Sequence, residues 1–282
     1  MKLLAILFKL ILKIKPLRKH YFGIYKKIIL PKKLFNNLSF NTTYDSSLLI
    51  KVNLSDWIQQ QIYFVDYSDL NGISYLKKQL KAGNVFIDIG ANIGAYSLIA
   101  SKLVGSNGKV VSFEPVSLIC KQLKQNIKLN NLANIVVEPK AVFDKNTTLE
   151  LFISDHQNMG MSSILNHSHE TGEKQSVQAI TIDEYVKIKS LLKIDFIKID
   201  IEGAEINALR GMKQTILKFN PIILMEISDG ILENSTINST MIYDFMNELN
   251  YTPYTINTDG NLLAFNSNNA NYHNYVFLPN NV

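Results

Sequence analysis

The sequence predicts an α/β fold built on a doubly wound sheet, mostly parallel with an antiparallel edge strand. Three observations support this prediction. Apolar runs of strand length alternate with helical stretches from residue 84 onward. The first run ends in a turn with two glycines, and the last two runs follow each other without room for a helix. Parallel strands need helical crossovers, so the alternation indicates a parallel sheet and the final pair indicates an antiparallel strand.

The expected elements follow in chain order. Strands are expected at 84–90, 109–114 and 135–142, with helices at 95–104 and 117–129 between them. An irregular stretch with its own short strand, TLELFIS, comes next. The alternation returns as the strand DFIKID, a helix at 205–219, the strand PIILMEI, a helix at 241–249, and the strands YTPYTIN and NYVFLP. Residues 84–282 are therefore predicted to form the main domain.

Two shorter regions precede the main domain. Residues 34–83 are predicted to be a lead-in that packs on it, and residues 1–33 a basic arm. Within the lead-in, LLIKVN and QIYFVDY are typical of strands, and ISYLKKQLKAG is typical of a helix ended by Gly83.

The arm holds the excess positive charge. Residues 1–33 contain ten Lys or Arg and no acid, whereas the rest of the chain carries 19 bases against 24 acids. The net charge of +5 therefore belongs to the arm, and the body is acidic. This division predicts an anionic surface as the partner of the arm. It also argues against a nucleic-acid groove in the main domain.

The arm begins MKLLAILFKLILKIKP, in which Lys2, Lys9 and Lys13 fall on one side of a helix. The apolar run is shorter than the roughly 20 residues that span a bilayer, and no small-residue cleavage site follows it. Peripheral membrane contact through residues 1–15 is the leading interpretation, and a helix packed on protein or on a second subunit is the alternative. A single cysteine, Cys120, allows no internal disulfide, which favours the cytoplasm, with the arm at the inner membrane face.

The stretch VFIDIGANIG carries the first chemical signal. A dinucleotide fingerprint is GxGxxG, because a pyrophosphate must lie against bare backbone. Here the spacing is GxxxG, from Gly90 to Gly94, and Asp88 stands where the first glycine would be. A carboxylate there would repel a pyrophosphate but would suit the ammonium group of S-adenosylmethionine. At the next strand tip, Glu114 can accept hydrogen bonds from both hydroxyls of a ribose.

These motifs resemble the FkbM-type S-adenosylmethionine-dependent methyltransferases. The likeness covers about residues 60–228 and is carried by VFIDIGANIG, VVSFEP, TIDEY, IKIDIEGAE, ALRGM and PIILMEI. It implies a class I, Rossmann-like methyltransferase fold for residues 84–282. The implied activity is O-methylation, with a hydroxyl of a saccharide, glycolipid or related metabolite as acceptor. TIDEY supports only the fold, because Thr181 and Glu184 form a helix capping box.

The resemblance also implies roles for single residues. Asp88, Gly90, Asn92 and Gly94 would hold the methionine end of the cofactor, Glu114 the ribose, and Pro115 and Ala141 the adenine. In KIDIEGAE, strand alternation puts Asp200 and Glu202 on one face. Asp200 is predicted to be catalytic, because a sugar hydroxyl is a poor nucleophile and needs a base to take its proton. Glu205 is predicted to cap a helix.

Other residues and functions stay open. His156, His167 and His169 are further candidates for the base or for a divalent metal, but their spacing defines no metal site. Ser162 and Ser163 would contact substrate or cofactor by resemblance. The alternatives are a methyltransferase for RNA or protein, which would want a basic groove, and a non-catalytic cofactor-fold protein, which would be expected to lose motif residues. The sequence does not indicate the oligomeric state.

Overall fold

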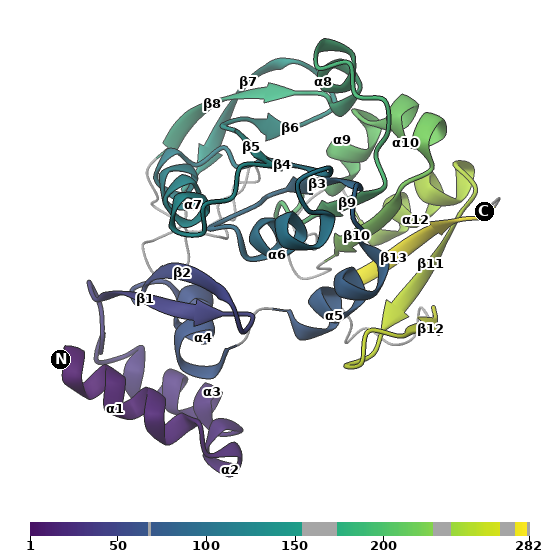
Figure 1. Ribbon diagram of the computed structural model, residues 1–282. Coiled ribbons are helices and arrows are strands. Elements are labelled where there is room, and N and C mark those ends of the chain that lie inside the picture. Colours follow the sequence, from purple (N-terminus) through teal and green to yellow (C-terminus); the bar gives the residue numbers. More distant parts are fainter. Residues whose placement is uncertain (67–68, 154–173, 228–237, 266–273, 281–282) are drawn as a thin grey trace. The chain divides into compact units, whose positions relative to one another are not determined.

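The structure, a computed structural model, describes residues 1–66, 69–153, 174–227, 238–265 and 274–280. These residues form two compact units (Figure 1). One is Met1–Asp69, and the other contains the described residues from Leu70 onward. The basic arm and most of the expected lead-in therefore share one unit, whereas residues 70–83 belong to the unit of the main sheet.

The first unit combines short helices with a two-stranded hairpin. Its helices and strands are α1 (Lys2–Leu12), α2 (Lys15–Arg18), α3 (Tyr21–Ile24), the π-helix η1 (Tyr25–Ile29), β1 (Ser39–Tyr44), β2 (Leu48–Asn53) and α4 (Trp57–Val65). The predicted strand LLIKVN is confirmed as β2, which pairs with β1 in antiparallel fashion. None of the helices in the described ranges is both long and apolar enough to cross a bilayer.

The prediction of a strand at QIYFVDY is wrong, because most of these residues lie in α4. Asp56 accepts a hydrogen bond from the Gln59 N–H at 3.0 Å and caps the helix. The buried Gln59 side chain in turn accepts a hydrogen bond from the Asn53 N–H at the end of β2. The two bonds satisfy the backbone N–H groups of Gln59 and Asn53, and they form with the segment after Asp56 in a helical turn. They therefore outweigh the strand preference of the aromatic and β-branched residues in this segment.

Among the described residues, eight strands form the main sheet of the second unit, in the order β12-β11-β13-β10-β9-β3-β4-β5. Their bounds are β3 (Val85–Ile89), β4 (Lys109–Phe113), β5 (Ile135–Glu138), β9 (Phe196–Ile199), β10 (Ile222–Glu226), β11 (Tyr251–Ile256), β12 (Leu262–Ala264) and β13 (Asn274–Pro279). The strands β5, β4, β3, β9 and β10 are parallel neighbours.

The predicted mostly parallel sheet with an antiparallel edge is confirmed. At the edge, β12 pairs antiparallel with β11. A second antiparallel strand is internal, because β13 inserts between β10 and β11 and pairs antiparallel with both. The succession of the last strands predicted an antiparallel partner but not this insertion.

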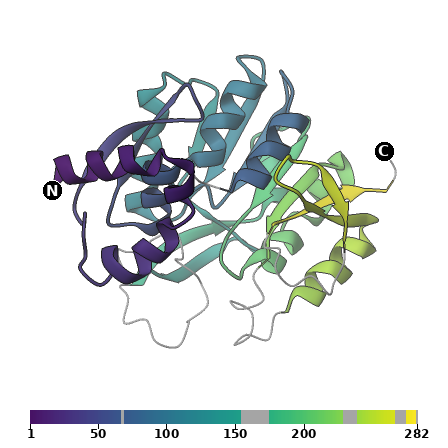
Figure 2. The same cartoon turned by 90° about the horizontal axis from the view of Figure 1, so that it is seen from below.

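Helices cover both faces of the main sheet (Figures 1 and 2). They are α5 (Leu70–Gln79), α6 (Ala95–Val104), α7 (Ser117–Leu129), α9 (Glu205–Arg210), α10 (Lys213–Phe219) and α12 (Ser239–Glu248). The helix expected at 205–219 is interrupted at Gly211. A Cβ at this position would lie 2.0 Å from the carbonyl oxygen of Phe143, so no larger residue fits there. Gly83 adopts a positive φ but lies beyond the end of α5, so it does not cap that helix as predicted.

A second, three-stranded sheet has the order β6-β8-β7, with β6 (Ala141–Val142), β7 (Thr147–Phe152) and β8 (Lys174–Ile180). The single strand expected at 135–142 is therefore two strands in two sheets, because Pro139 and Lys140 interrupt the pairing. Thr181 caps the helix α8 (Ile182–Ile188) by accepting the Glu184 N–H at 3.1 Å, as predicted. The other half of the box is replaced, since the Thr181 N–H donates to Asn146.

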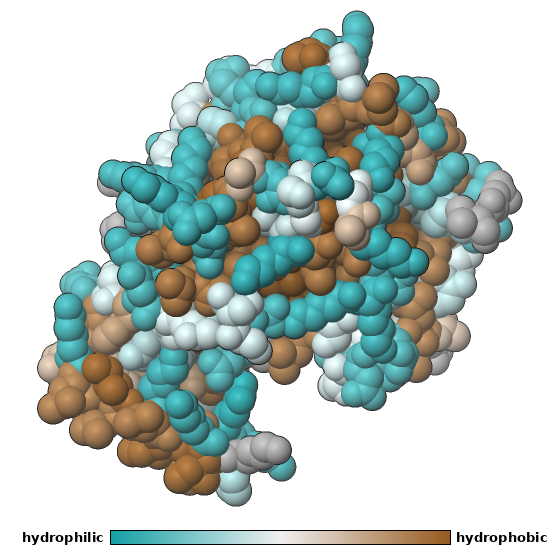
Figure 3. All heavy atoms as spheres, in the orientation of Figure 1, coloured by the Kyte–Doolittle hydropathy of each residue, from teal (hydrophilic) through white to brown (hydrophobic). Residues whose placement is uncertain are grey.

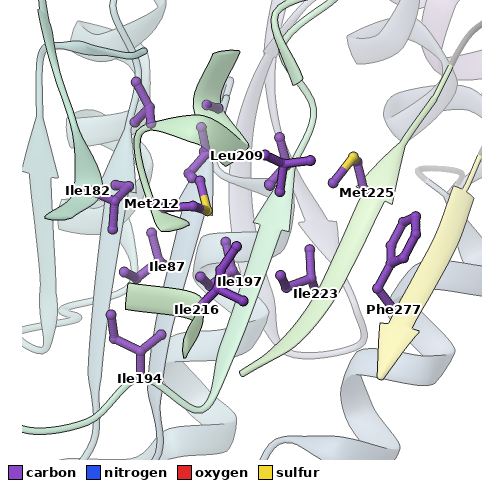
Figure 4. Close-up of a cluster of buried hydrophobic side chains, with 14 of the residues drawn as sticks. Ile87, Ile182, Ile194, Ile197, Leu209, Met212, Ile216, Ile223, Met225 and Phe277 are labelled. Atoms are coloured by element: carbon purple, nitrogen blue, oxygen red, sulfur yellow. The ribbon is translucent and has the colours of Figure 1, made fainter. Parts of the chain in front are cut away.

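The core fixes the ends of the central strands. Figure 4 shows Ile87, Ile197 and Ile223 in a row on neighbouring strands. Leu209 of α9, Ile216 of α10 and Met212 between these two helices pack against the row. On the opposite face, Phe196 lies against Tyr75 of α5, with ring centroids 6.2 Å apart. A one-residue shift of β3 or β9 would turn its side chains to the opposite face and bring the buried Asp88 or Lys198 among these isoleucines, so the carboxyl ends of the strands stay in register.

Candidate active site at the strand ends

Three adjacent strands end together at one edge of the main sheet. β3 lies between β4 and β9, and Ile89 is paired with Phe113 on one side and Ile199 on the other. The residues that follow are Gly90, Glu114 and Asp200. Backbone hydrogen bonds of 3.0 Å link Gly90 to Phe113 and Asp200 to Ile89. The structure therefore brings together three residues that the sequence places far apart.

Gly90 is required by the close approach of two loops. Its φ is +81°, and a Cβ there would lie 1.9 Å from the carbonyl oxygen of Asp200. No side chain fits, so the glycine lets the loop after β3 lie directly on the loop after β9. Gly94, with φ +99°, begins α6, and a Cβ there would lie 2.6 Å from Leu123. The glycine therefore lets the start of α6 pack closely against Leu123 of α7.

Glu114 holds the loop after β3. Its Oε2 accepts the N–H of Asn92, and its Oε1 accepts the N–H of Val116, each at 2.9 Å. Burial raises the pKa of Glu114 to about 7, although the two N–H donors act in the opposite direction. An ionised carboxylate has about four lone-pair sites, so each oxygen of Glu114 can accept a further hydrogen bond.

Asp88 has one satisfied oxygen and one without a partner. Its Oδ2 accepts a hydrogen bond from the Ser97 hydroxyl at 2.5 Å. Its Oδ1 is buried and has no hydrogen-bond partner among the described residues. Burial raises the pKa of Asp88, and the positive charge of Lys198 opposes this change. Buried polar atoms are rarely left unsatisfied, so Oδ1 is suited to a donor from a ligand.

Lys198 is the functional residue that sequence reasoning missed. Its Nζ lies 2.8 Å from Oδ2 of Asp200, and the β3–β9 register places it opposite Asp88. Burial lowers the pKa of Lys198, but the carboxylates of Asp200 and Asp88 outweigh that effect and raise it. The two-residue spacing in Lys-Ile-Asp, which puts both side chains on one face of a strand, is the signal that could have revealed this ion pair.

The lysine and the aspartate differ in exposure. The Lys198 side chain is 6% exposed and lies 4.8 Å from the Tyr96 ring centroid, whereas the Asp200 side chain is 31% exposed. A charged lysine held on an aromatic ring has little freedom to move. Lys198 therefore fixes one oxygen of a carboxylate that solvent and ligands can still reach.

Two further acids complete the loop after β9. Glu205 is the first residue of α9, as its predicted capping role requires, but the N–H that its side chain accepts at 3.0 Å belongs to Gly203 in the loop before the helix. Glu202 adopts a positive φ of +53°. Burial, together with the charges of Asp200 and Glu205, raises the pKa of Glu202 to about 8. The raised pKa favours the protonated form of this carboxyl group, which can donate a hydrogen bond.

The other residues predicted to bind the cofactor have fewer contacts with this edge of the main sheet. Pro115 follows Glu114, and its carbonyl accepts a hydrogen bond from Gln175 at 3.0 Å. Ala141 lies in β6 of the second sheet instead of ending the third strand of the main sheet, so its adenine contact stays a prediction. Cys120 is buried on α7.

The candidates in the segment between β7 and β8 lie outside the described residues: His156, His167, His169, Ser162 and Ser163. Within the described part of the chain, no three His, Cys, Asp or Glu side chains are grouped as a metal ion would need.

Comparison with known proteins identifies the family. The profile of the FkbM methyltransferase domain matches residues 88–253, and that of the protein-L-isoaspartate(D-aspartate) O-methyltransferases matches residues 31–140. "Methyltransferase 1" of Beauveria bassiana is 22% identical over 161 residues, covering 51% of this chain and 64% of that protein. "Hexuronic acid methyltransferase AglP" of Haloferax volcanii is 25% identical over 167 residues, covering 58% and 65%.

The chain thus spans less than two thirds of the length of these two relatives. Among solved structures, it is similar to an FkbM methyltransferase of Methylobacillus flagellatus KT, with a TM-score of 0.45 and 14% identity over 79% of this chain and 55% of that one. The FkbM profile covers more than half of the chain and includes all three strand ends of the site. The chain therefore belongs to the FkbM family of S-adenosylmethionine-dependent methyltransferases, with the class I, Rossmann-like fold.

Proposed function

We propose that the protein is an O-methyltransferase that moves the methyl group of S-adenosylmethionine to a hydroxyl of a saccharide, glycolipid or related metabolite. The observation that carries the proposal is the junction of β3, β4 and β9. Glu114, a carboxylate of the kind that can bind ribose hydroxyls, lies at this edge of the sheet. The Lys198–Asp200 ion pair lies at the same edge, at the end of β9.

The residues fit the cofactor. Glu114 would bind the two ribose hydroxyls through the lone pairs that Asn92 and Val116 leave free. Oδ1 of Asp88, which has no hydrogen-bond partner within the described part of the chain, is suited to the ammonium group. The glycine turn from Gly90 to Gly94 would lie along the methionine end. Pro115 and Ala141 would line the adenine.

When bound, S-adenosylmethionine supplies a methyl group on a positively charged sulfur, which is open to attack by an oxygen nucleophile. The contribution of the chain is to orient the acceptor and to remove its proton. In this proposal, Asp200 accepts the hydroxyl proton while Lys198 holds the carboxylate in place. Alignment of the reactants accounts for much of the remaining rate enhancement.

A saccharide acceptor is favoured by two observations. One of the relatives is described as a hexuronic acid methyltransferase. In addition, the chain beyond residue 33 carries more acids than bases, which disfavours a polyanionic substrate such as RNA. A divalent metal that would acidify the hydroxyl is not part of this proposal.

The test uses S-adenosylmethionine with a labelled methyl group and separate glycan, glycolipid, RNA and protein fractions of the host. We expect label in a saccharide as a methyl ether, and about a hundredfold slower labelling with the Asp200→Asn variant. Label in RNA or protein would replace this proposal by the alternative enzyme. Cofactor binding with no labelled fraction would instead support a non-catalytic binding protein. Loss of labelling on addition of a chelator would reveal a metal requirement.

A further inference from the structure

The helix α1 presents a wide apolar face to solvent. Its exposed large side chains, together with the adjoining Ile14, include Leu3, Leu4, Leu7, Leu10 and Ile11. Leu3 is 70% exposed and Leu10 52%. Figure 3 shows hydrophobic side chains gathered over the part of the molecule where Figure 1 draws α1. Contiguous exposed apolar patches of this kind mark sites of protein or membrane interaction.

The opposite, narrower face of α1 attaches the helix to its unit. Ala5 and Leu12 are buried. The Phe8 ring lies 5.2 Å from that of Phe64 on α4. Lys9 donates a hydrogen bond to Thr42 at 2.6 Å and lies 4.3 Å from the Tyr63 ring centroid. The apolar face is therefore held outward by packing.

This arrangement changes the expected orientation of the lysines. The sequence places Lys9 with Lys2 and Lys13 on one polar side, but the structure turns Lys9 inward. Lys2 and Lys13 are exposed. At about 100° per residue, the exposed apolar side chains, which also include Ile6, are centred between Leu3 and Leu7. Lys2 and Lys13 lie at one flank of this face, roughly 100–120° from its centre. A helix lying in a membrane surface has this distribution, with apolar side chains toward the acyl chains and lysines toward the headgroups.

Charge identifies the partner. Residues 1–33 contain ten Lys or Arg and no acid. A second copy of the chain, packed face to face on α1, would bring these bases together with no acid in the segment to pair with them. An anionic lipid surface neutralises them instead. The segment is also too short to span a bilayer.

We propose that α1 lies in the surface of an anionic lipid bilayer, with Leu3, Leu7 and Leu10 inserted and Lys2 and Lys13 at the headgroups. This proposal does not depend on the methyl acceptor. It would hold the catalytic unit of the same chain near a membrane.

The test is sedimentation of the full chain with liposomes of phosphatidylglycerol and phosphatidylcholine, compared with phosphatidylcholine alone. The chain should bind the anionic liposomes at low salt and be released at high salt. Leu7→Gln/Leu10→Gln should weaken binding about tenfold or more, because each leucine loses apolar burial. The matched control Leu192→Gln/Leu217→Gln changes two exposed leucines outside α1 and should leave binding unchanged.

A second variant covers the case in which the leucine variant fails to fold. Lys2→Glu/Lys13→Glu alters only exposed side chains and should also weaken binding to anionic liposomes. Full-length protein that ignores anionic liposomes overturns the proposal, as does normal binding by both α1 variants. If ultracentrifugation shows a dimer that Leu7→Gln/Leu10→Gln converts to monomer while liposomes are ignored, the face is an interface between copies and the proposal fails.

Discussion

Replacing Glu114 by glutamine tests the cofactor site most directly. Both carboxylate oxygens accept backbone N–H groups at 2.9 Å, from Asn92 and Val116. Glutamine keeps one acceptor oxygen but turns an NH₂ group toward the other N–H donor. It also removes the negative charge that would receive the ribose hydroxyls. Hydrogen bonds to charged groups contribute about 1.5–3 kcal/mol, so we expect S-adenosylmethionine to bind roughly ten- to a hundredfold more weakly.

Isothermal titration calorimetry at a pH above the raised pKa of Glu114, which is about 7, measures this effect. Thermal unfolding of the free variant shows whether its fold is retained. Glu150→Gln is the matched control, since it makes the same chemical change on an exposed side chain of β7 paired with Lys174. A folded Glu114→Gln variant with unchanged affinity would refute the ribose assignment. Equal losses of affinity in both variants would point to a general charge effect.

Three other predictions follow from the site. Asp200→Asn should lower turnover about a hundredfold while cofactor affinity stays within a few fold, as expected when a general base is lost; full activity by initial-rate assay would return Asp200 to a structural role. Lys198→Met should destabilise the protein by roughly 1–3 kcal/mol, less than a fully buried pair because Asp200 is one third exposed; an unchanged denaturation midpoint would contradict this. The free energy of unfolding of the free protein should fall as the pH rises from about 6 to 8. The pKa values of Glu114 (about 7) and Glu202 (about 8) are raised in the folded state, so the folded state binds more protons than the unfolded state. Melting temperatures that do not change across this range would show that ionising these carboxyl groups does not lower stability.

The sequence by itself determined the main sheet and much of the site. Strand and helix periods are local properties, so α6 and α7 match their predicted ranges residue for residue. The meeting of Gly90, Glu114 and Asp200 was also predictable, because neighbouring parallel strands end at one edge of the sheet.

Contacts between distant residues decided the rest. The segment after Asp56 is helical because its glutamine bonds to the end of β2, although its composition suits a strand. Lys198 became a site residue only when β3 and β9 paired and set it opposite Asp88. On α1, an almost wholly apolar helix, periodicity does not decide which side faces the protein. Packing of Phe8 and Lys9 on residues more than 30 positions away turns the leucine face toward solvent.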